Sequence, residues 1–381
     1  MTETRRLLIL GVSARAAAFS AVRAGYMPLA VDCFRDEDLP VGSVCRRVDS
    51  YPTGFEAEAA ALPQCPWLYT GGLENHPKLV GRIAKQRPLL GNSERVLRRV
   101  RNPFALAEVL RCEGLPSLDV SAAPPDSASA DWLQKPRRSG GGRRIAFVSR
   151  TATDRFEPMR RFYYQRHVRG TACSAVYVAS NGRAVWLGAT QQLIGTPWTG
   201  ARGFEYAGSI GPLAVSPEEQ TQWRAIGQCL AARFELSGLF GVDAVMSDGA
   251  LWVVEVNPRY TASVEVLELA RGVDLLGPHV LACKTGELPA ERSGRSEERR
   301  VGKAIVYAEH DGRVPTSFKQ FLGNVNANPA RPAVADIPAT GRAFQRGEPL
   351  VTVLAEGGSL SEVEQRLQQQ VALVQAALAC V

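Results

Sequence analysis

Two acidic residues and an amide near the middle of the chain have the types and spacing of a metal site. Residues 241–259 read GVDAVMSDGALWVVEVNPR, a pattern that predicts two strands joined by a three-residue turn at 247–249. With a turn of that length, Asp243 and Glu255 share one face of the hairpin, and Asn257 follows on the same face. Two carboxylates about 4 Å apart repel by roughly 4 kcal/mol at an effective dielectric of 20, so they must share a proton or a cation.

The amide oxygen of Asn257 favours the cation. Three oxygen ligands on a rigid ribbon suit Mg²⁺, which completes its coordination shell with water and phosphate oxygens, and Mn²⁺ is an alternative ion for the same ligands. A surface hairpin with ordinary polar residues is the other interpretation. The apolar residues Leu251 to Val254 and Val256 argue against it, because they predict a buried strand, in which unpaired carboxylates are unfavourable.

A lysine beside a glycine run predicts a second binding element, this one for an anion. Lys135 is one of only six lysines and stands at the end of an expected strand, shortly before Gly140, Gly141 and Gly142. Backbone N–H groups of consecutive glycines can wrap around an anion, and the ammonium adds a point charge on phosphate. No Gly-Lys-Ser/Thr follows, so this is not a Walker loop. A flexible turn is the alternative for the glycine run by itself.

Two loops carry candidate substrate contacts. An expected short strand at 67–70 leads into a Gly-Gly turn with Glu74 and Asn75, and open sheets bind ligands at the carboxyl ends of their strands. The segment 191–211, which begins with Gln191, is rich in Gly, Gln and Thr and predicts an active-site loop. A plain turn before a capped helix is the alternative for Glu74 and Asn75.

Length and composition limit the class of protein. A chain of 381 residues with 45% hydrophobic residues predicts two or three domains with sizeable cores. No run of 18 or more apolar residues is present, so we expect no membrane span and no secretory signal, and we expect a soluble, cytoplasmic protein. The eight cysteines form no CxxC pair and the four histidines are far apart, which predicts reduced thiols and neither a disulfide framework nor a zinc site.

The net charge of +7 comes from arginines that are spread along the chain in short dyads without interleaved aromatic residues. Such a distribution does not favour nucleic-acid binding, so no nucleic-acid partner is expected.

The amino-terminal segment predicts a β-α-β unit of the doubly wound kind, with a strand at 6–12, a helix at 14–24 and a strand at 28–32. Asp32 follows Gly11 by about 20 residues, as the ribose-binding acid of a dinucleotide site would. The Gly-x-Gly-x-x-Gly turn is missing, however, so a nicotinamide-dependent oxidoreductase stays only an alternative.

The remaining pattern predicts an α/β fold in three parts. It includes a helical segment at 95–112 broken near Pro103, a hairpin turning at Asn181-Gly182, and a final helix at 361–379. The expected parts are a Rossmann-like domain at 1–95, a central domain at 96–290 with a flexible small lobe near 117–180, and a small α+β domain at 301–381.

Residues 135–288 together resemble an ATP-grasp enzyme. Asp243, Glu255 and Asn257 resemble the magnesium ligands of that superfamily, and Lys135 with its glycine run resembles the flexible loop over the phosphates. The resemblance implies a Rossmann-like amino-terminal domain, a two-lobed ATP-binding region and a small β-rich carboxyl-terminal domain.

A hinge segment completes the resemblance. Gln165, Arg166, His167 and Val168, which lead to Gly170, resemble the segment whose main-chain groups meet adenine in these enzymes, although acidic residues are common at its start. A second departure lies at Asn102-Pro103, where many members have Asp-Lys. One phosphate-binding lysine is therefore absent, and the neighbouring Arg101 is the candidate to replace it.

The resemblance implies an ADP-forming ligase that uses ATP and Mg²⁺ to convert a small carboxylic acid into an acyl phosphate, which a small amine then attacks. Arg259 is placed to hold the carboxylate or the acyl phosphate, a structural ion pair being its alternative role. The tail 336–352 resembles tyramine/glutamate ligases of methanofuran biosynthesis, which implies glutamate as the acid and a one-carbon coenzyme pathway. The alternative is a degenerate ATP-grasp protein that binds nucleotide or ligand without turnover. The sequence leaves the oligomeric state open, a homodimer included.

Overall fold

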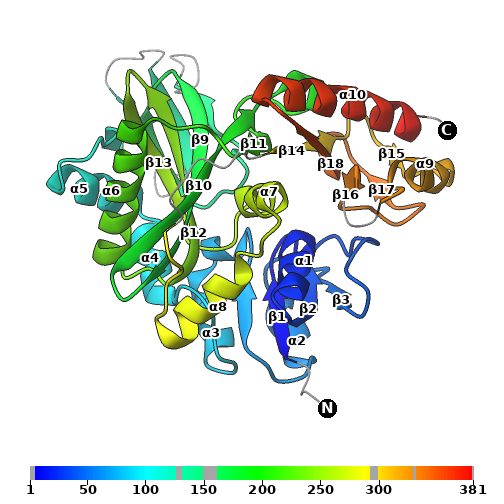
Figure 1. Cartoon of the computed structure of the whole chain (residues 1–381), viewed down its shortest axis with the longest axis horizontal. Coiled ribbons are helices and arrows are strands. Elements are labelled where there is room, and N and C mark those ends of the chain that lie inside the picture. The colour runs from blue at the N-terminus through cyan, green and yellow to red at the C-terminus, as the bar shows by residue number, and fades with distance from the viewer. Residues whose placement is uncertain (1–4, 126–130, 149–160, 292–298, 329–331, 380–381) are drawn as a thin grey trace.

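The molecule consists of a parallel amino-terminal sheet, a long antiparallel sheet, a small four-stranded sheet and a two-stranded sheet, with helices packed around them (Figure 1). The structure is a computed structural model that describes residues 5–125, 131–148, 161–291, 299–328 and 332–379. Parts of the expected small lobe, residues 126–130 and 149–160, lie outside the described residues. Among the helices that the structure describes, none is long and apolar enough to cross a bilayer.

The amino-terminal sheet confirms the expected β-α-β opening. Its four parallel strands have the order β3-β2-β1-β4. They are β1 (Arg6–Leu10), β2 (Met27–Asp32), β3 (Val44–Arg47) and β4 (Trp67–Tyr69). The associated helices are α1 (Arg15–Arg23), α2 (Gly54–Ala60), η1 (Leu73–Asn75) and α3 (Pro77–Ala84). Because the strands are parallel, their carboxyl ends share one edge of the sheet, where Glu74 and Asn75 follow β4.

The long sheet joins the central and carboxyl-terminal parts of the chain. Its order is β13-β12-β9-β10-β11-β14-β18-β16, and β11 pairs with β14 across the expected boundary near residue 301. The strands are β9 (Thr171–Ser180), β10 (Arg183–Ile194), β11 (Tyr206–Gly211), β12 (Gly238–Ser247), β13 (Ala250–Asn257), β14 (Arg300–Tyr307), β16 (Val334–Ala335) and β18 (Pro349–Gly357). The carboxyl-terminal strands β14, β16 and β18 therefore extend the central sheet, while β15 (Gly312–Arg313) and β17 (Ala343–Phe344) pair with each other in a separate two-stranded sheet.

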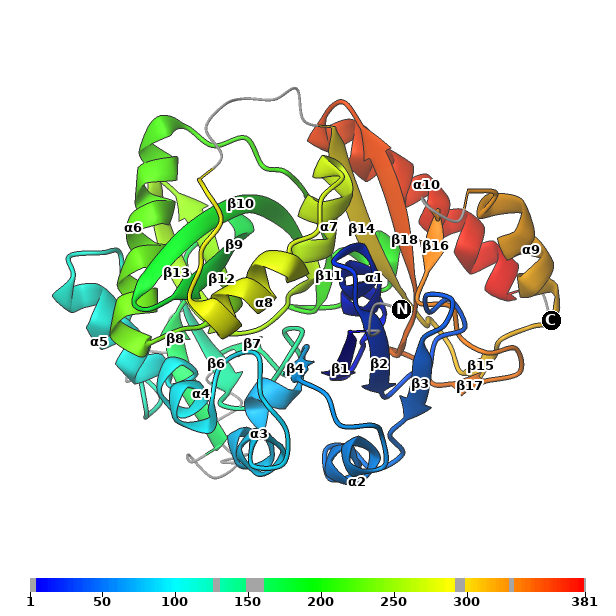
Figure 2. The ribbon, with the colours of Figure 1, turned by 60° about the horizontal axis from the view of Figure 1, so that its bottom comes forward.

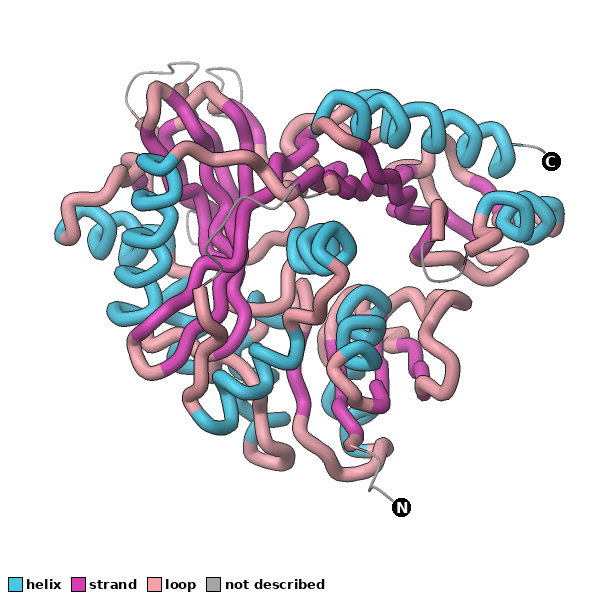
Figure 3. Tube along the Cα trace, in the orientation of Figure 1, coloured by secondary structure: helices cyan, strands magenta, loops and turns pink. Residues whose placement is uncertain are grey.

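Helices cover both faces of this sheet. The helix α6 (Pro217–Phe234) packs on one face, while α7 (Ala262–Arg271) and α8 (Leu276–Thr285) lie on the other, between the sheet and α1 (Figure 2). Along β14 and β18 runs α10 (Leu360–Ala379), with α9 (Ser317–Val325) beside it (Figure 3). The short elements η4 (Pro197–Thr199), β15 (Gly312–Arg313) and β17 (Ala343–Phe344) complete this part.

The small sheet and two helices lie beside β12 and β13. The sheet has the order β5-β8-β6-β7. Its strands are β5 (Val120–Ser121), β6 (Trp132–Pro136), β7 (Ala146–Phe147) and β8 (Phe162–Arg166). The helices α4 (Glu94–Val100) and α5 (Pro103–Cys112) confirm the predicted break near Pro103, which occupies the first position of α5, where a proline needs no hydrogen-bond partner.

A buried ion-pair network holds the three parts together. Arg15 of α1 is 2% exposed and binds Glu265 of α7 (Nη2 to Oε1, 2.6 Å) and Asp336 (Nε to Oδ1, 2.7 Å). Glu265 also accepts a hydrogen bond from Lys303 of β14. Because each buried charge has an opposite partner, removing a single partner would leave an uncompensated ion in the interior.

His279 of α8 connects the amino-terminal part with β12. Its Nδ1 accepts a hydrogen bond from the N–H of Leu239 (2.8 Å), and its Nε2 donates to the carbonyl oxygen of Leu90 (3.2 Å). Burial lowers the pKa of His279 to about 4. The native state therefore keeps this imidazole neutral over the range in which an unfolded chain protonates it.

We expect the free energy of unfolding to fall as the pH is lowered from 7 to 5. With the His279 pKa at about 4 in the native state and its ordinary value of 6.5 in the unfolded state, the unfolded state binds more protons in this window. The loss from this residue is about 2 kcal/mol.

Urea unfolding at pH 7 and at pH 5 measures the loss in free energy of unfolding that His279 contributes. His279→Gln should remove that part of the pH dependence, whereas His310→Gln, at an exposed histidine, should keep it. Equal pH dependence in wild type and His279→Gln would contradict the assignment.

Candidate active site

The hairpin that carries the acidic residues turns more tightly than the sequence predicts. Ser247 pairs directly with Ala250, so the loop has two residues, Asp248 and Gly249. Both have positive φ angles, 51° and 74°, as a type I′ turn requires and as Asp-Gly readily adopts. The predicted three-residue turn at 247–249 is therefore wrong.

A β-bulge in β13 nevertheless brings the two carboxylates together. Ala244 pairs with Val253, but the next pair is Asp243 with Glu255, so Val254 has no partner in the ladder. This extra residue reverses the alternation that a two-residue turn would otherwise impose. The predicted common face is correct, but its cause is the bulge.

The two facing carboxyl groups differ in their ionisation. Burial and the negative charge of Glu255 raise the pKa of Asp243 to about 6. Burial also disfavours ionisation of Glu255, but the positive charges of Arg101, Lys135 and Arg259 outweigh it and lower its pKa. The Glu255 side chain keeps 36% of its surface exposed, so the pair is open to solvent on one side.

Asn257 lies at the same site, but its amide nitrogen, and not the predicted amide oxygen, faces Asp243. Its Nδ2 donates to Asp243 Oδ2 (2.9 Å), and its Oδ1 accepts from Arg259 Nη2 (3.1 Å). Among the described residues, no cluster of three or more His, Cys, Asp or Glu side chains could hold a metal ion. A cation here would use the two carboxylates and, after the amide turns, the amide oxygen. That donor set fits Mg²⁺.

Lys135 is held in place by a glutamine that also contacts the bulge. Lys135, 5% exposed, donates from Nζ to Gln165 Oε1 (2.9 Å). Gln165 in turn donates from Nε2 to the carbonyl oxygen of Val254 (3.2 Å). The side chain of Gln165 thus fixes the ammonium relative to the acidic hairpin, a role that the sequence did not suggest for this expected hinge residue.

Arg101 follows α4 and reaches the same hairpin. Its Nη1 lies 3.2 Å from Glu255 Oε2 and donates to the carbonyl oxygen of Val256. Its Nη2 donates to the carbonyl oxygen of Ser139 (3.3 Å), next to the glycine run, and lies 3.4 Å from Asn75 Oδ1. The guanidinium of the residue before Asn102-Pro103 therefore lies beside the acidic residues.

Arg259 pairs with the loop that follows β4. Its Nε lies 2.8 Å from Glu74 Oε1. The other carboxylate oxygen of Glu74 is buried without a hydrogen-bond partner among the described residues. Asn75 donates from Nδ2 to the carbonyl oxygen of Ser139 (3.2 Å). Both predicted loop residues thus lie at this site, and Arg259 does form an ion pair.

The glycine run folds over the segment before β11. Tyr206 donates its backbone N–H to the carbonyl oxygen of Gly141 (3.0 Å). Gly141 and Gly142 have φ angles of 64° and 72°, and a Cβ on Gly142 would lie 1.7 Å from the carbonyl oxygen of Phe204. Only glycine fits this close approach.

The hinge residues differ in what they leave available to a ligand. The N–H groups of Arg166 and His167 already donate to the carbonyl oxygens of Asp119 and Asp131. The main-chain groups of Val168 have no hydrogen bond within the described part of the chain. The His167 ring lies 5.0 Å from the Phe147 ring, which is exposed. A base bound here would therefore meet Val168 and this aromatic pair.

Gln192, and not the predicted Gln191, faces the acidic pair. Gln192 donates from Nε2 to Asp243 Oδ1 (3.2 Å). Gln191 pairs with Cys173 of β9 and points to the opposite face, because successive side chains of a strand alternate. The predicted active-site loop at 191–211 is therefore partly wrong, because residues 191–194 end β10 and residues 206–211 form β11. Which glutamine faces the acidic pair follows only from the register of β10.

Comparison with known proteins identifies the kind of domain in the centre of the chain. Residues 100–263 match the family model described as ATP-grasp domain. A segment of 193 residues is 24% identical to an uncharacterized protein of Methanocaldococcus jannaschii and covers 50% of this chain and 42% of that protein. Another of 118 residues is 23% identical to the carbamoyl phosphate synthase large chain of Kocuria rhizophila, covering 30% of this chain and 10% of that one. The chain thus matches less than half the length of either relative.

Solved structures resemble the whole chain. The L-amino acid ligase of Bacillus licheniformis has a TM-score of 0.68 at 13% identity, covering 97% of this chain and 98% of that one. The complex of Aspergillus clavatus N5-carboxyaminoimidazole synthase with ADP and 5-aminoimidazole ribonucleotide has a TM-score of 0.68 at 13% identity. The match covers 99% of this chain and 100% of that one. Campylobacter jejuni biotin carboxylase with β-γ-ATP has a TM-score of 0.70 at 13% identity, and the match covers 98% of this chain and 95% of that one. The chain therefore contains an ATP-grasp domain, at residues 100–263, and has the ATP-grasp fold.

Proposed function

We propose that this protein is an ATP- and magnesium-dependent ligase that joins a carboxylate to an amine through an acyl phosphate and releases ADP and phosphate. The observation that carries the proposal is the convergence of Arg101, Lys135 and Arg259 on the facing carboxylates Asp243 and Glu255. Phosphoryl transfer requires a protein mainly to position the reactants and to neutralise charge, and this arrangement offers groups for both.

The acidic hairpin is the proposed metal site. Asp243, Glu255 and the amide oxygen of Asn257 would hold Mg²⁺, which neutralises the phosphate oxygens of ATP. Lys135, Arg101 and the N–H groups of Gly140 to Gly142 would bind those oxygens from the other side. The same three ligands could also hold Mn²⁺.

Arg259 is the proposed orienting residue for the acid. A carboxylate oxygen attacks the γ-phosphorus while the bond to ADP breaks, and the amine then attacks the acyl carbon while phosphate leaves. A guanidinium can hold a carboxylate through two parallel hydrogen bonds, and Glu74 fixes the Arg259 guanidinium through its Nε. A substrate carboxylate bound in this way would keep a defined orientation toward the nucleotide.

Small-molecule acids and amines are the proposed partners. The fold likeness includes an L-amino acid ligase, which supports an amino acid as one substrate. The carboxyl-terminal tail supports glutamate as the acid and a one-carbon coenzyme pathway as the process in which the ligase acts. A homodimer stays a prediction. One similar structure, from Hydrogenobacter thermophilus, is a dimer of a biotin carboxylase domain.

Nucleotide binding without turnover is the second candidate function. It is favoured by Asn102-Pro103 in place of Asp-Lys and by the amide of Asn257, whose Nδ2 and not its oxygen faces Asp243. ADP release in the presence of a panel of amino acids separates the two candidates.

We expect Asp243→Asn and Glu255→Gln each to lower the rate of magnesium-dependent ADP release by about 100-fold or more, because each removes one of two anionic ligands. Asp248→Asn, in the exposed turn of the same hairpin, is the matched control and should keep the wild-type rate. Circular dichroism checks that the variants fold. Normal turnover by either site variant would show that the metal assignment is wrong.

A second variant tests how Lys135 is positioned. Gln165→Leu removes both the acceptor for Lys135 and the donor to Val254, so we expect KM for ATP to rise about tenfold. Gln228→Leu also removes two amide hydrogen bonds, to Gly182 and Ala184, but lies on α6 away from the site. It should leave KM for ATP unchanged. An unchanged KM in Gln165→Leu would contradict the positioning role.

A further inference from the structure

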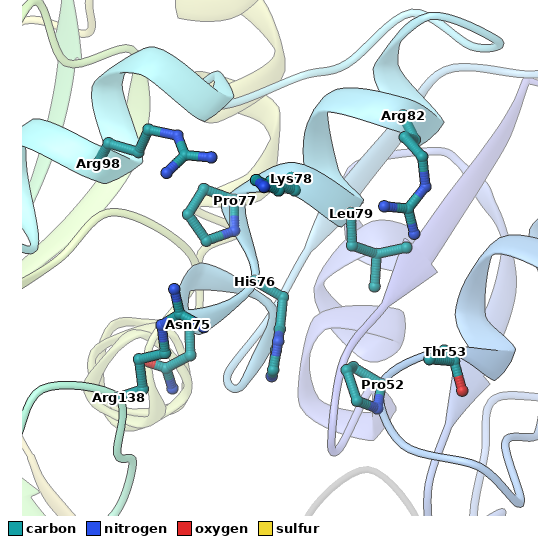
Figure 4. A pocket seen from close by; sticks show the side chains of 10 residues that line it. All are labelled: Pro52, Thr53, Asn75, His76, Pro77, Lys78, Leu79, Arg82, Arg98 and Arg138. Carbon is teal, nitrogen blue, oxygen red and sulfur yellow. The ribbon is translucent and has the colours of Figure 1, made fainter. Parts of the chain in front are cut away.

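A cavity of about 200 Å³ lies next to the candidate active site, at the first turn of α3 (Figure 4). Its wall is formed by α3, α4, the loop before α2 and the segment between β6 and the glycine run. This volume exceeds many times the space that a single water molecule needs. It is therefore large enough for a phosphate or carboxylate group with a few attached carbons.

The wall of this pocket is strongly basic. It includes Lys78, Arg82, Arg98 and Arg138, and none of the described residues that line it is acidic. Figure 4 shows them coming from three segments, because α3 carries both Lys78 and Arg82, α4 carries Arg98, and Arg138 precedes the glycine run. Cationic side chains that converge without an acidic residue among them produce a positive potential that attracts anions.

Two of the four cations have no partner of their own. Arg82 lies 2.7 Å from Glu56 and Arg98 lies 2.7 Å from Glu94, so both are compensated outside the pocket. Lys78 and Arg138 form neither an ion pair nor a hydrogen bond with any described residue. Both side chains are exposed, so water solvates them in the free protein and an anionic ligand can reach them without breaking an ion pair.

The pKa of His76, which lines the pocket, reflects its burial and the positive charge of the neighbouring Arg138. Burial and then the positive charge of Arg138 lower the pKa of His76. Its Nε2 lies 3.1 Å from the hydroxyl of Tyr51, which also lies 3.0 Å from the carbonyl oxygen of Gly72. The lowered pKa favours the neutral imidazole, and the contact with Tyr51 holds the ring in the wall of the pocket.

Asn75 connects the pocket to the proposed centre of reaction. It lines the pocket, donates to the carbonyl oxygen of Ser139 and lies 3.4 Å from Arg101, which pairs with Glu255. Arg138 lies immediately before Ser139 in the chain, so it belongs to both the pocket and the loop over the phosphates. An anion held by Lys78 and Arg138 would therefore be separated from the acidic hairpin by Asn75 and Arg101.

We propose that this pocket binds a terminal anionic group, a phosphate or a second carboxylate, of the substrate whose other end reacts at the acidic hairpin. The inference rests on the proposed function and specifies its substrate class: one of the two joined molecules carries an anionic end distant from its reacting group. The two unpartnered cations contact that end, and Asn75 separates it from the site of phosphoryl transfer.

Calorimetric titration of the full chain at low ionic strength tests the proposal without turnover. The probes are inorganic phosphate and glutarate, with acetate as a singly charged control. We expect Lys78→Met and Arg138→Met each to weaken the better-bound probe about tenfold or more, because each removes a charge-assisted contact. Lys85→Met, an equal change of charge at the end of α3 and outside the pocket, should have no such effect.

The outcomes separate the alternatives. Tighter binding of phosphate identifies a phosphorylated substrate, and tighter binding of glutarate identifies a dicarboxylate. If Lys78→Met binds both probes like Lys85→Met, the proposal is wrong. The same holds if only Arg138→Met weakens phosphate, because the anion would then lie at the glycine run.

Steady-state kinetics separate this inference from the proposed function. Lys78→Met should raise KM for one of the two joined substrates about tenfold and leave KM for ATP unchanged. A rise in KM for ATP alone would overturn the proposal. If the wild type formed no ADP while Lys78→Met still lost phosphate binding, the anion site would stand and the ligase proposal would fall.

Discussion

The close approach of Asp243 and Glu255 is the constraint on which the other side chains of the site depend. Burial and mutual repulsion both oppose two negative charges at this place, and the raised pKa of Asp243 is the result. Glu255 stays ionised because Arg101, Lys135 and Arg259 surround it. Without a bound cation, these three positive side chains are what allow the two carboxylates to lie side by side, and their positions follow from that requirement.

The three cations come from separate parts of the fold, so the site exists only when those parts are packed together. Arg101 follows α4, Lys135 lies in the small sheet and Arg259 follows β13. Glu74 at the edge of the amino-terminal sheet holds Arg259. The ion-pair network around Arg15 holds that amino-terminal sheet against α7 and the carboxyl-terminal part. Interfaces far from the chemistry therefore contribute to the relative positions of the charges.

The sequence predicted the elements well and the registers poorly. The β-α-β opening, the break at Pro103 and the Asn-Gly hairpin follow from local chemistry and were confirmed. Asp-Gly at 248–249 is also a local signal, and its preference for a two-residue turn was given too little weight. The bulge at Val254 has no local signal, because a valine in a valine-rich strand gives no indication that it is unpaired. Gln192 and the pairing of Gln165 with Lys135 were missed for a related reason: both depend on how distant strands align.

The bulge has two effects on the site, and together they fix the position of the acidic pair relative to Lys135. An unpaired residue in an antiparallel ladder shifts the register by one, which places Asp243 opposite Glu255. It also leaves the carbonyl group of Val254 outside the pairing of β12 with β13, where it accepts from Gln165. In a regular hairpin with the same two-residue turn, the two carboxylates would lie on opposite faces. The carbonyl oxygen of Val254 would then pair with β12 and would not accept a hydrogen bond from Gln165. A single additional residue in β13 therefore sets the distance between the acidic side chains and the ammonium of Lys135, so neither could be repositioned without the other.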